Sequence, residues 1–109
     1  MSESDRLSLE DIEYVKNSIR TFSKKWTTEI AILLVRKDGG VGFNEMMREL
    51  DGISAAVLSN RLKTLQKSGY ITREVKTGPP TRSVYGLTPK GKSFAETMQL
   101  IVKHRKTYG

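Results

Sequence analysis

Residues 52–74, GISAAVLSNRLKTLQKSGYITRE, contain the pattern that decides the fold. Ser54 is suited to cap the start of a helix, because its hydroxyl can accept a hydrogen bond from an unpaired backbone N–H of the first turn. Three leucines then recur at intervals of four and three residues: Leu58, Leu62 and Leu65. This spacing places them on one buried face. Gly69 suits the left-handed conformation that ends many helices. The stretch therefore predicts a capped amphipathic helix over 54–68.

The residues after Gly69 have the alternation of a β-strand. Tyr70, Thr72 and Glu74 alternate with Ile71, Arg73 and Val75, the period of two of a strand. A second strand is predicted over 83–87. The loop TGPPTR between them contains two prolines, which cannot belong to a central strand because they lack the N–H donor. We therefore predict a β-hairpin over 70–88 with basic residues around its tip: Arg73, Lys76 and Arg82.

The helix face opposite the leucines is small near its start, polar in the middle and basic further on, without an acidic residue. It contains Ala56, Ser59, Asn60, Lys63 and Lys67. Such a face suits a helix whose first turns enter the major groove of DNA, as in helix-turn-helix proteins. On its own it fits an ordinary solvated surface equally well, so the rest of the sequence has to decide.

A short helix precedes the capped one. Phe43, Met46, Met47 and Leu50 are spaced like one helix face, and the methionine pair is interpreted as core. Asp51-Gly52 forms the tight turn that follows. Together the two helices predict a helix-turn-helix unit over 43–68. Asn44 and Glu45 begin the short helix and are interpreted as structural, with Asn44 within reach of a phosphate.

An N-terminal helix is predicted over 8–23, with Ser8 and Asp11 close to a capping box. Its apolar residues form a narrow seam: Ile12, Val15, Ile19 and Phe22. Such a seam can pack on its own core or on a partner chain, and in a domain this small we favour the partner.

Two further helices are predicted. The one over 26–37 is apolar nearly all round and therefore central, with Trp26 as a core anchor and Asp38-Gly39-Gly40 as the turn that follows. The last begins at Thr88-Pro89, a cap with proline at its preferred first position, and extends over 89–106. Its apolar stripe is Phe94, Met98, Ile101 and Val102.

The composition restricts the class of protein. A chain of 109 residues is long enough for one domain, 1–109, with a single core. It contains no cysteine, which excludes disulfides and thiolate metal sites. It has no membrane-spanning apolar run and no signal-peptide pattern, so we expect it in the cytoplasm. The fold class predicted is mainly α with a small β-hairpin wing (α+β), a winged helix-turn-helix.

The net charge of +7 is unevenly distributed. Residues 1–53 contain eight basic and ten acidic side chains, whereas residues 54–109 contain eleven basic and two acidic ones. A basic half joined to a weakly acidic half is typical of a protein that binds a polyanion. Together with the helix-turn-helix and the basic hairpin, it favours double-stranded DNA.

The sequence resembles the HxlR-type winged-helix regulators. The resemblance rests on Phe43-Asn44-Glu45-Met46, Gly52-Ile53-Ser54, Arg61-Leu62, the wing segment PTRSVYGLT (80–88) and Lys25-Trp26. It covers about residues 25–91. It implies a homodimeric transcriptional regulator that dimerises through its terminal helices, in agreement with the N-terminal seam. The family often has a cysteine near the N-terminus, which is absent here.

We predict that DNA is contacted by two sets of residues. The groove-facing turns are Ser54, Ala55, Ala56, Ser59 and Asn60, with Asn60 suited to bidentate pairing with adenine. Arg61, Lys63, Lys67, Arg73 and Lys76 are expected near phosphates, which set affinity and register, and Arg82 near the minor groove. Lys67 can equally serve the helix dipole. The dimer interface is expected to contain Ile12, Val15, Ile19, Phe22, Met98, Ile101 and Val102.

Other functions are less favoured. No nucleophile, carboxylate pair or metal-ligand cluster surrounds the single histidine, His104, so we expect neither an enzyme nor a cofactor or metal. The alternatives are a winged-helix protein-interaction module and a non-specific chromatin or nucleic-acid-binding protein. A small-molecule effector is compatible with the family, but no polar constellation marks its site.

Overall fold

The computed structural model describes residues 6–38 and 40–109. Within them the element order is α1 (Leu9–Phe22), α2 (Thr27–Arg36), β1 (Val41–Gly42), α3 (Phe43–Glu49), α4 (Ala55–Lys67), β2 (Ile71–Lys76), β3 (Arg82–Leu87) and α5 (Pro89–Tyr108). The predicted fold class, mainly helical with a small β wing, is confirmed. Gly39 of the expected turn Asp38-Gly39-Gly40 lies outside the described residues.

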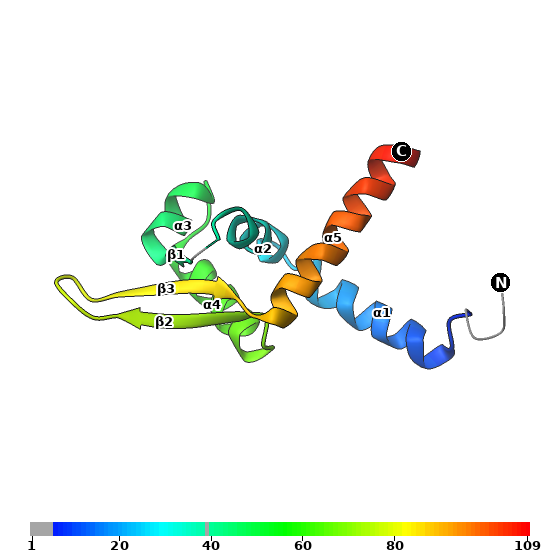
Figure 1. Ribbon diagram of the computed structural model, residues 1–109, viewed down its shortest axis with the longest axis horizontal. Coiled ribbons are helices and arrows are strands. Elements are labelled where there is room, and N and C mark those ends of the chain that lie inside the picture. Colours follow the sequence, from blue (N-terminus) through cyan, green and yellow to red (C-terminus); the bar gives the residue numbers. More distant parts are fainter. Residues whose placement is uncertain (1–5, 39) are drawn as a thin grey trace.

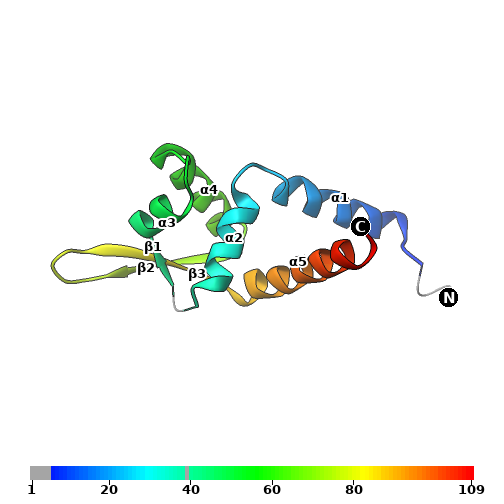
Figure 2. The same ribbon diagram turned by 90° about the horizontal axis from the view of Figure 1, so that it is seen from above.

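The molecule is elongated, with extents of 59 × 28 × 24 Å. The hairpin of β2 and β3 projects from one end of the helical body, and α1 and α5 extend from the opposite end (Figures 1 and 2). None of the described helices is long and apolar enough to cross a membrane. The tip of the wing and the free ends of α1 and α5 therefore lie at opposite ends of the molecule (Figures 1 and 2).

The sheet has one strand more than the sequence predicts. Its order is β1-β3-β2, all antiparallel, and Val41 pairs with Tyr85 while Gly42 pairs with Val84. A two-residue strand shows no alternation in the sequence. It forms because the backbone of β3 offers hydrogen-bond partners on its free side, and the pairing fixes the start of α3 against the wing.

The core lies between α2, α3, α4 and the base of the wing. The leucines of α4 and the apolar face of α3 bury together, as predicted from their spacing. Fully buried side chains come from four elements: Ile30, Val41, Met46, Leu58 and Leu62. Trp26 packs against this core partly buried, in agreement with an anchor, and has a positive φ of 78° at the N-cap of α2. The core therefore holds the two helices of the helix-turn-helix unit in fixed relation to the hairpin.

Local capping sets the boundaries of the helices. The Ser54 hydroxyl accepts from the Val57 N–H at 3.1 Å, and the Thr88 hydroxyl accepts from the Gly91 N–H at 3.0 Å, each satisfying an otherwise unpaired donor of the first turn. Gly69 has a φ of 83° where α4 ends. These three positions set the length of α4 and the starting points of the wing and α5.

The capping box of α1 makes the start of this helix sensitive to acid. The Ser8 N–H donates to the Asp11 carboxylate at 2.9 Å, and the Asp11 N–H donates to the Ser8 hydroxyl at 3.0 Å. These bonds to the backbone and side chain of Ser8 hold the pKa of Asp11 below its ordinary value of 3.8. Because the folded-state pKa is depressed, the stabilisation is present above that ordinary value and is lost as the pH falls through the depressed one.

We therefore expect the first turn of α1 to lose helical NMR chemical shifts as the pH falls below about 4, while the centre of α4 keeps them. The matched variant Asp11→Asn should be less helical in this turn at neutral pH and should show no acid transition there. The same transition in the variant would contradict the role of Asp11.

Candidate nucleic-acid interface

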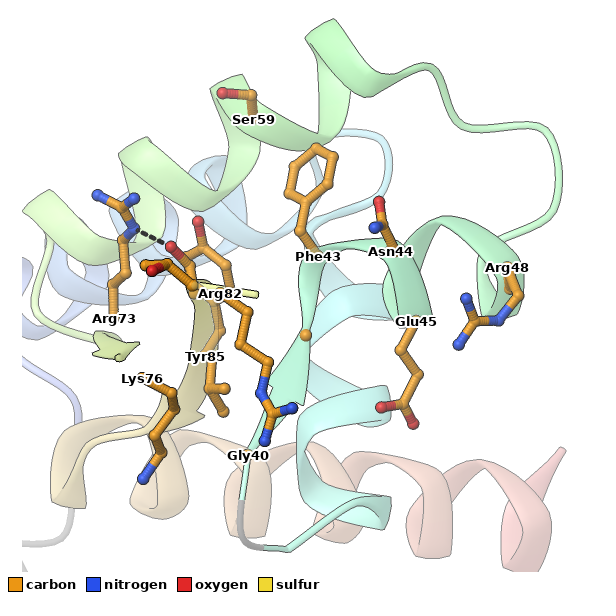
Figure 3. A pocket seen from close by; sticks show the side chains of 14 residues that line it. Gly40, Phe43, Asn44, Glu45, Arg48, Ser59, Arg73, Lys76, Arg82 and Tyr85 are labelled. Carbon is orange, nitrogen blue, oxygen red and sulfur yellow. Dashed lines mark hydrogen bonds between the residues drawn. The ribbon is translucent and has the colours of Figure 1, made fainter. Parts of the chain in front are cut away.

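A groove of about 730 Å³ opens between α3, α4 and the wing. In Figure 3 its polar side chains converge from separate elements, with Asn44 and Arg48 on α3, Ser59 on α4, and Arg73, Lys76 and Arg82 on the wing. Ser59, Arg73, Lys76 and Arg82 are among the sequence-predicted DNA contacts, and the fold brings these four together.

The groove is positively charged. Arg48, Arg73, Lys76 and Arg82 line it together with a single acid, Glu45. The Glu45 carboxylate lies 3.3 Å from the Lys37 ammonium, which offsets its charge. A concave surface with an excess of cations concentrates anions from solution. The lining therefore suits the sugar-phosphate backbone of a nucleic acid.

The wing arranges its cations at a cost. Lys76 and Arg82 pair directly across the hairpin, and like charges at paired positions destabilise a sheet. The Glu74 carboxylate, 3.0 Å from the Lys76 ammonium, offsets part of this repulsion. The Arg73 Nε donates to the Ser83 hydroxyl at 2.9 Å, the bond drawn in Figure 3. An anion bound between or beside Lys76 and Arg82 would offset the repulsion that remains between them.

The exposed side of α4 carries most of the predicted reading residues. Ala55 and Ala56 are exposed in the first turn, and Asn60, Lys63 and Lys67 are exposed further along. Ser54 is exposed too, but its hydroxyl caps the helix. The exposed side therefore presents small residues first and polar or basic residues afterwards, as the sequence predicts.

Arg61, predicted to lie near a phosphate, makes hydrogen bonds within its own chain. It lies on the flank of α4, half-buried, and its Nε donates to the Lys25 carbonyl at 2.9 Å while its Nη1 donates to the Asn60 Oδ1 at 3.0 Å. Its place on the helix follows from the 100° step per residue, which puts position 61 near the far side of the helix from Ser59. Two of its five N–H donors are thus engaged within the chain, and its contact with a phosphate stays a prediction.

Arg48 is a groove residue that the sequence reasoning missed, and Asn44 is more central than expected. Both line the groove. They are four residues apart, so a helix over 43–50 necessarily places them on one face. The i, i+4 spacing is therefore the sequence signal for this pair, and it lies on the face opposite the apolar residues of the same helix.

The predicted dimer residues divide into two groups. Ile12, Val15 and Ile19 of α1 are 37%, 47% and 62% exposed, and Ile101 and Val102 of α5 are 63% and 48% exposed. The two helices meet where Phe22 stacks on Phe94 and diverge beyond that point (Figure 1), and these five apolar side chains stay partly or largely exposed.

Phe22 does not belong to this exposed set, which corrects its assignment to the dimer seam. Its ring is 9% exposed, stacks on Phe94 with centroids 3.3 Å apart and meets Tyr70 edge-on. The last turn of α1 points into its own chain, so Phe22 anchors α1 to α5 and to the base of the wing. Met98 lies half-buried in a shallow apolar hollow of about 280 Å³ between α2 and α5.

These features define a class of protein, the winged helix-turn-helix DNA-binding proteins. The family model of the HxlR-like helix-turn-helix matches residues 21–109. The chain belongs to this family, and it is a DNA-binding transcriptional regulator. The resemblance stated from the sequence is thus confirmed.

Individual relatives agree. The chain is 34% identical over 102 residues to an HTH-type transcriptional regulator of Methanothermobacter thermautotrophicus, covering 91% of this chain and 76% of the relative. It is 35% identical over 88 residues to the HTH-type transcriptional regulator YvaP of Bacillus subtilis, covering 81% and 80%. Both relatives are named as HTH-type transcriptional regulators.

Solved structures share the fold. A transcriptional regulator of the MarR family from Enterococcus faecalis V583 superposes with a TM-score of 0.84 at 27% identity, over 98% of this chain and 94% of that chain. The reduced form of YodB from B. subtilis superposes with a TM-score of 0.79 at 23% identity, over 94% and 95%.

Proposed function

We propose that the chain is a homodimeric repressor that reads a specific double-stranded DNA operator. In this proposal α4 enters the major groove, and the wing contacts the backbone and, through Arg82, the minor groove. The strongest support for this proposal is the basic groove between α3, α4 and the wing. When α4 lies in the major groove, the sugar-phosphate backbone passes beside the helix, where this groove can contact it.

The proposed dimer uses the exposed apolar seams of α1 and α5. A two-fold axis through these helices would place two copies of α4 on one side of the molecule. Recognition helices about one DNA turn apart, roughly 34 Å, read a pseudo-palindrome. A protein bound to such a site prevents other proteins from occupying the same DNA, so we propose that it represses transcription. We place this activity in the cytoplasm.

Binding to fragments of genomic DNA tests this proposal against its alternatives. Footprinting should reveal one protected pseudo-palindrome, and transcription in vitro from the adjoining promoter should fall when the protein is added. Uniform protection of every fragment would instead indicate a non-specific nucleic-acid-binding protein. Absence of protection would favour a protein-interaction module. A small-molecule effector stays a prediction, tested by repeating the footprint with candidate compounds.

Lys63 is expected to contact a phosphate, since it is exposed on the reading side of α4. Replacing Lys63 by Ala should weaken binding to all duplexes alike and lower the slope of log affinity against log salt by about one unit, because one fewer counterion is released. Fluorescence anisotropy at several salt concentrations measures this slope. Thr64→Ala, a neighbouring exposed position whose hydroxyl donates to the Asn60 carbonyl, is the control without a charge change. An unchanged slope in Lys63→Ala would remove Lys63 from the phosphate contacts.

A further inference from the structure

Arg61 joins the reading side of α4 to the turn between α1 and α2. Its Nε donates to the Lys25 carbonyl at 2.9 Å, across 36 positions of sequence. Its Nη1 donates to the Oδ1 of Asn60 at 3.0 Å. One guanidinium therefore fixes two groups at once: a backbone carbonyl of the α1–α2 turn and the amide of an exposed residue on the helix proposed to enter the major groove.

This contact determines how the Asn60 amide is turned. A guanidinium contains only hydrogen-bond donors, whereas an asparagine amide has an acceptor oxygen at one end and a donor nitrogen at the other. Only the oxygen end can face Arg61. The nitrogen end, with its two N–H donors, then points away from Arg61. An asparagine without such a neighbour can turn either end outward.

The orientation of the Asn60 amide affects which base it can recognise. Bidentate recognition of adenine requires an asparagine to accept from N6 and donate to N7 at the same time, whereas guanine presents two acceptors, N7 and O6, in the major groove. Arg61 occupies one of the two acceptor sites of the Asn60 oxygen and turns that oxygen toward itself. The outward-pointing N–H donors therefore dominate what the amide presents, which matches the guanine edge better than the adenine edge.

We propose that Arg61 is a positioning residue that holds Asn60 as a hydrogen-bond donor and thereby directs it to guanine instead of adenine. This inference rests on the proposed function, since it requires α4 to lie in the major groove. It replaces the adenine pairing that the sequence alone suggests for Asn60. The bond to the Lys25 carbonyl contributes to this positioning, because it fixes the guanidinium that orients the Asn60 amide.

Selection from a pool of duplexes with randomised positions tests the effect on base preference. The base pair contacted by Asn60 is the one whose preference disappears in Asn60→Ala, and wild type should select guanine there. In Arg61→Lys, which keeps the charge but has no fork to reach both acceptors, and in Arg61→Met, the guanine-to-adenine ratio at that base pair should fall by about tenfold. The double variant Arg61→Met with Asn60→Ala should resemble Asn60→Ala, because Arg61 acts through Asn60.

The salt dependence separates positioning from phosphate binding. On the duplex that wild type selects, Arg61→Met should keep the wild-type slope, whereas Lys63→Met, the matched loss of charge on the same helix, should lower it by about one unit. A lower slope in Arg61→Met with unchanged base preference would overturn the proposal in favour of a phosphate contact. Selection of adenine by wild type at the Asn60 base pair would overturn it as well.

A measurement on the free protein distinguishes failure of this inference from failure of DNA reading. In NMR spectra without DNA, the Arg61 Nε–H should exchange slowly with solvent, and the Asn60 side-chain amide should be less mobile in wild type than in Arg61→Lys. Fast exchange and equal mobility would overturn the positioning role even if the protein reads DNA. Slow exchange in a protein that prefers no sequence would instead overturn the proposed function and with it the assignment to guanine.

Discussion

Replacing both Val15 and Ile19 by aspartate is expected to turn the proposed dimer into a monomer and to weaken binding to a palindromic site by about 100-fold or more. The two side chains are 47% and 62% exposed on α1, so the double variant removes little from the core of its own chain. The loss of affinity follows because a monomer binds each half-site separately, whereas a dimer binds the second half-site intramolecularly.

The position of α1 supports the proposal that a second copy of the chain covers its apolar seam. The helix has 14 residues and projects from the body of the molecule (Figure 1). Isolated helices of this length are marginal in water, and tertiary packing of an apolar face supplies most of their stability in proteins. Phe22 packs at its last turn, but the seam before it stays exposed. A second copy of the chain, with the same exposed residues on α1 and α5, would cover it.

Sedimentation equilibrium measures the oligomeric state, and anisotropy with full-site and half-site duplexes measures the affinity. The matched control is Val75→Ser, another exposed apolar residue, 51% exposed on β2, which should remain dimeric. The double aspartate variant should bind a half-site about as well as it binds a full site. A variant that stays dimeric, or a wild type that is monomeric at micromolar concentration, would contradict the proposed interface.

The elements that the sequence predicts well are those set by neighbours in the chain. Ser54 and Thr88 cap helices through bonds to residues three positions away, and the leucine spacing of α4 follows from helical geometry alone. The exposed side of α4, which contains Ala56, Asn60 and Lys63, is predictable for the same reason, because it lies opposite the buried leucines.

The elements that escape prediction depend on partners distant in the sequence. β1 exists because Val41 and Gly42 meet β3, and Phe22 turns inward because Phe94 lies opposite it. Arg61 has the charge expected of a phosphate contact, and only the Lys25 carbonyl, 36 positions away in the sequence, shows that its Nε–H is engaged within the chain. Pattern thus indicates which face a residue occupies, while the fold decides what that residue binds.

Gly91→Ala is expected to lower the free energy of unfolding by about 3 kcal/mol and the melting temperature by about 15 °C. Gly91 is buried in the first turn of α5, and a Cβ there would overlap the Tyr70 carbonyl oxygen and approach the Leu87 Cδ2 to 3.0 Å. The carbonyl cannot easily move, because it accepts from the Thr88 N–H at 3.1 Å. This bond joins the residue before β2 to the residue after β3. The overlap therefore costs more than alanine ordinarily gains over glycine within a helix, about 1 kcal/mol.

Thermal unfolding followed by circular dichroism measures this loss, with Gly86→Ala as the matched control. A Cβ at Gly86 would have the Thr72 hydroxyl as its nearest neighbour at 3.8 Å, an ordinary contact, so we expect a change within about 0.5 kcal/mol. The contrast isolates the close approach of α5 to Tyr70 from the general effect of adding a methyl group. Because Tyr70 also meets the rings of Phe22 and Phe94, displacement of α5 should loosen α1 together with it. Gly91→Ala at wild-type stability would contradict the close approach of α5 to the Tyr70 carbonyl.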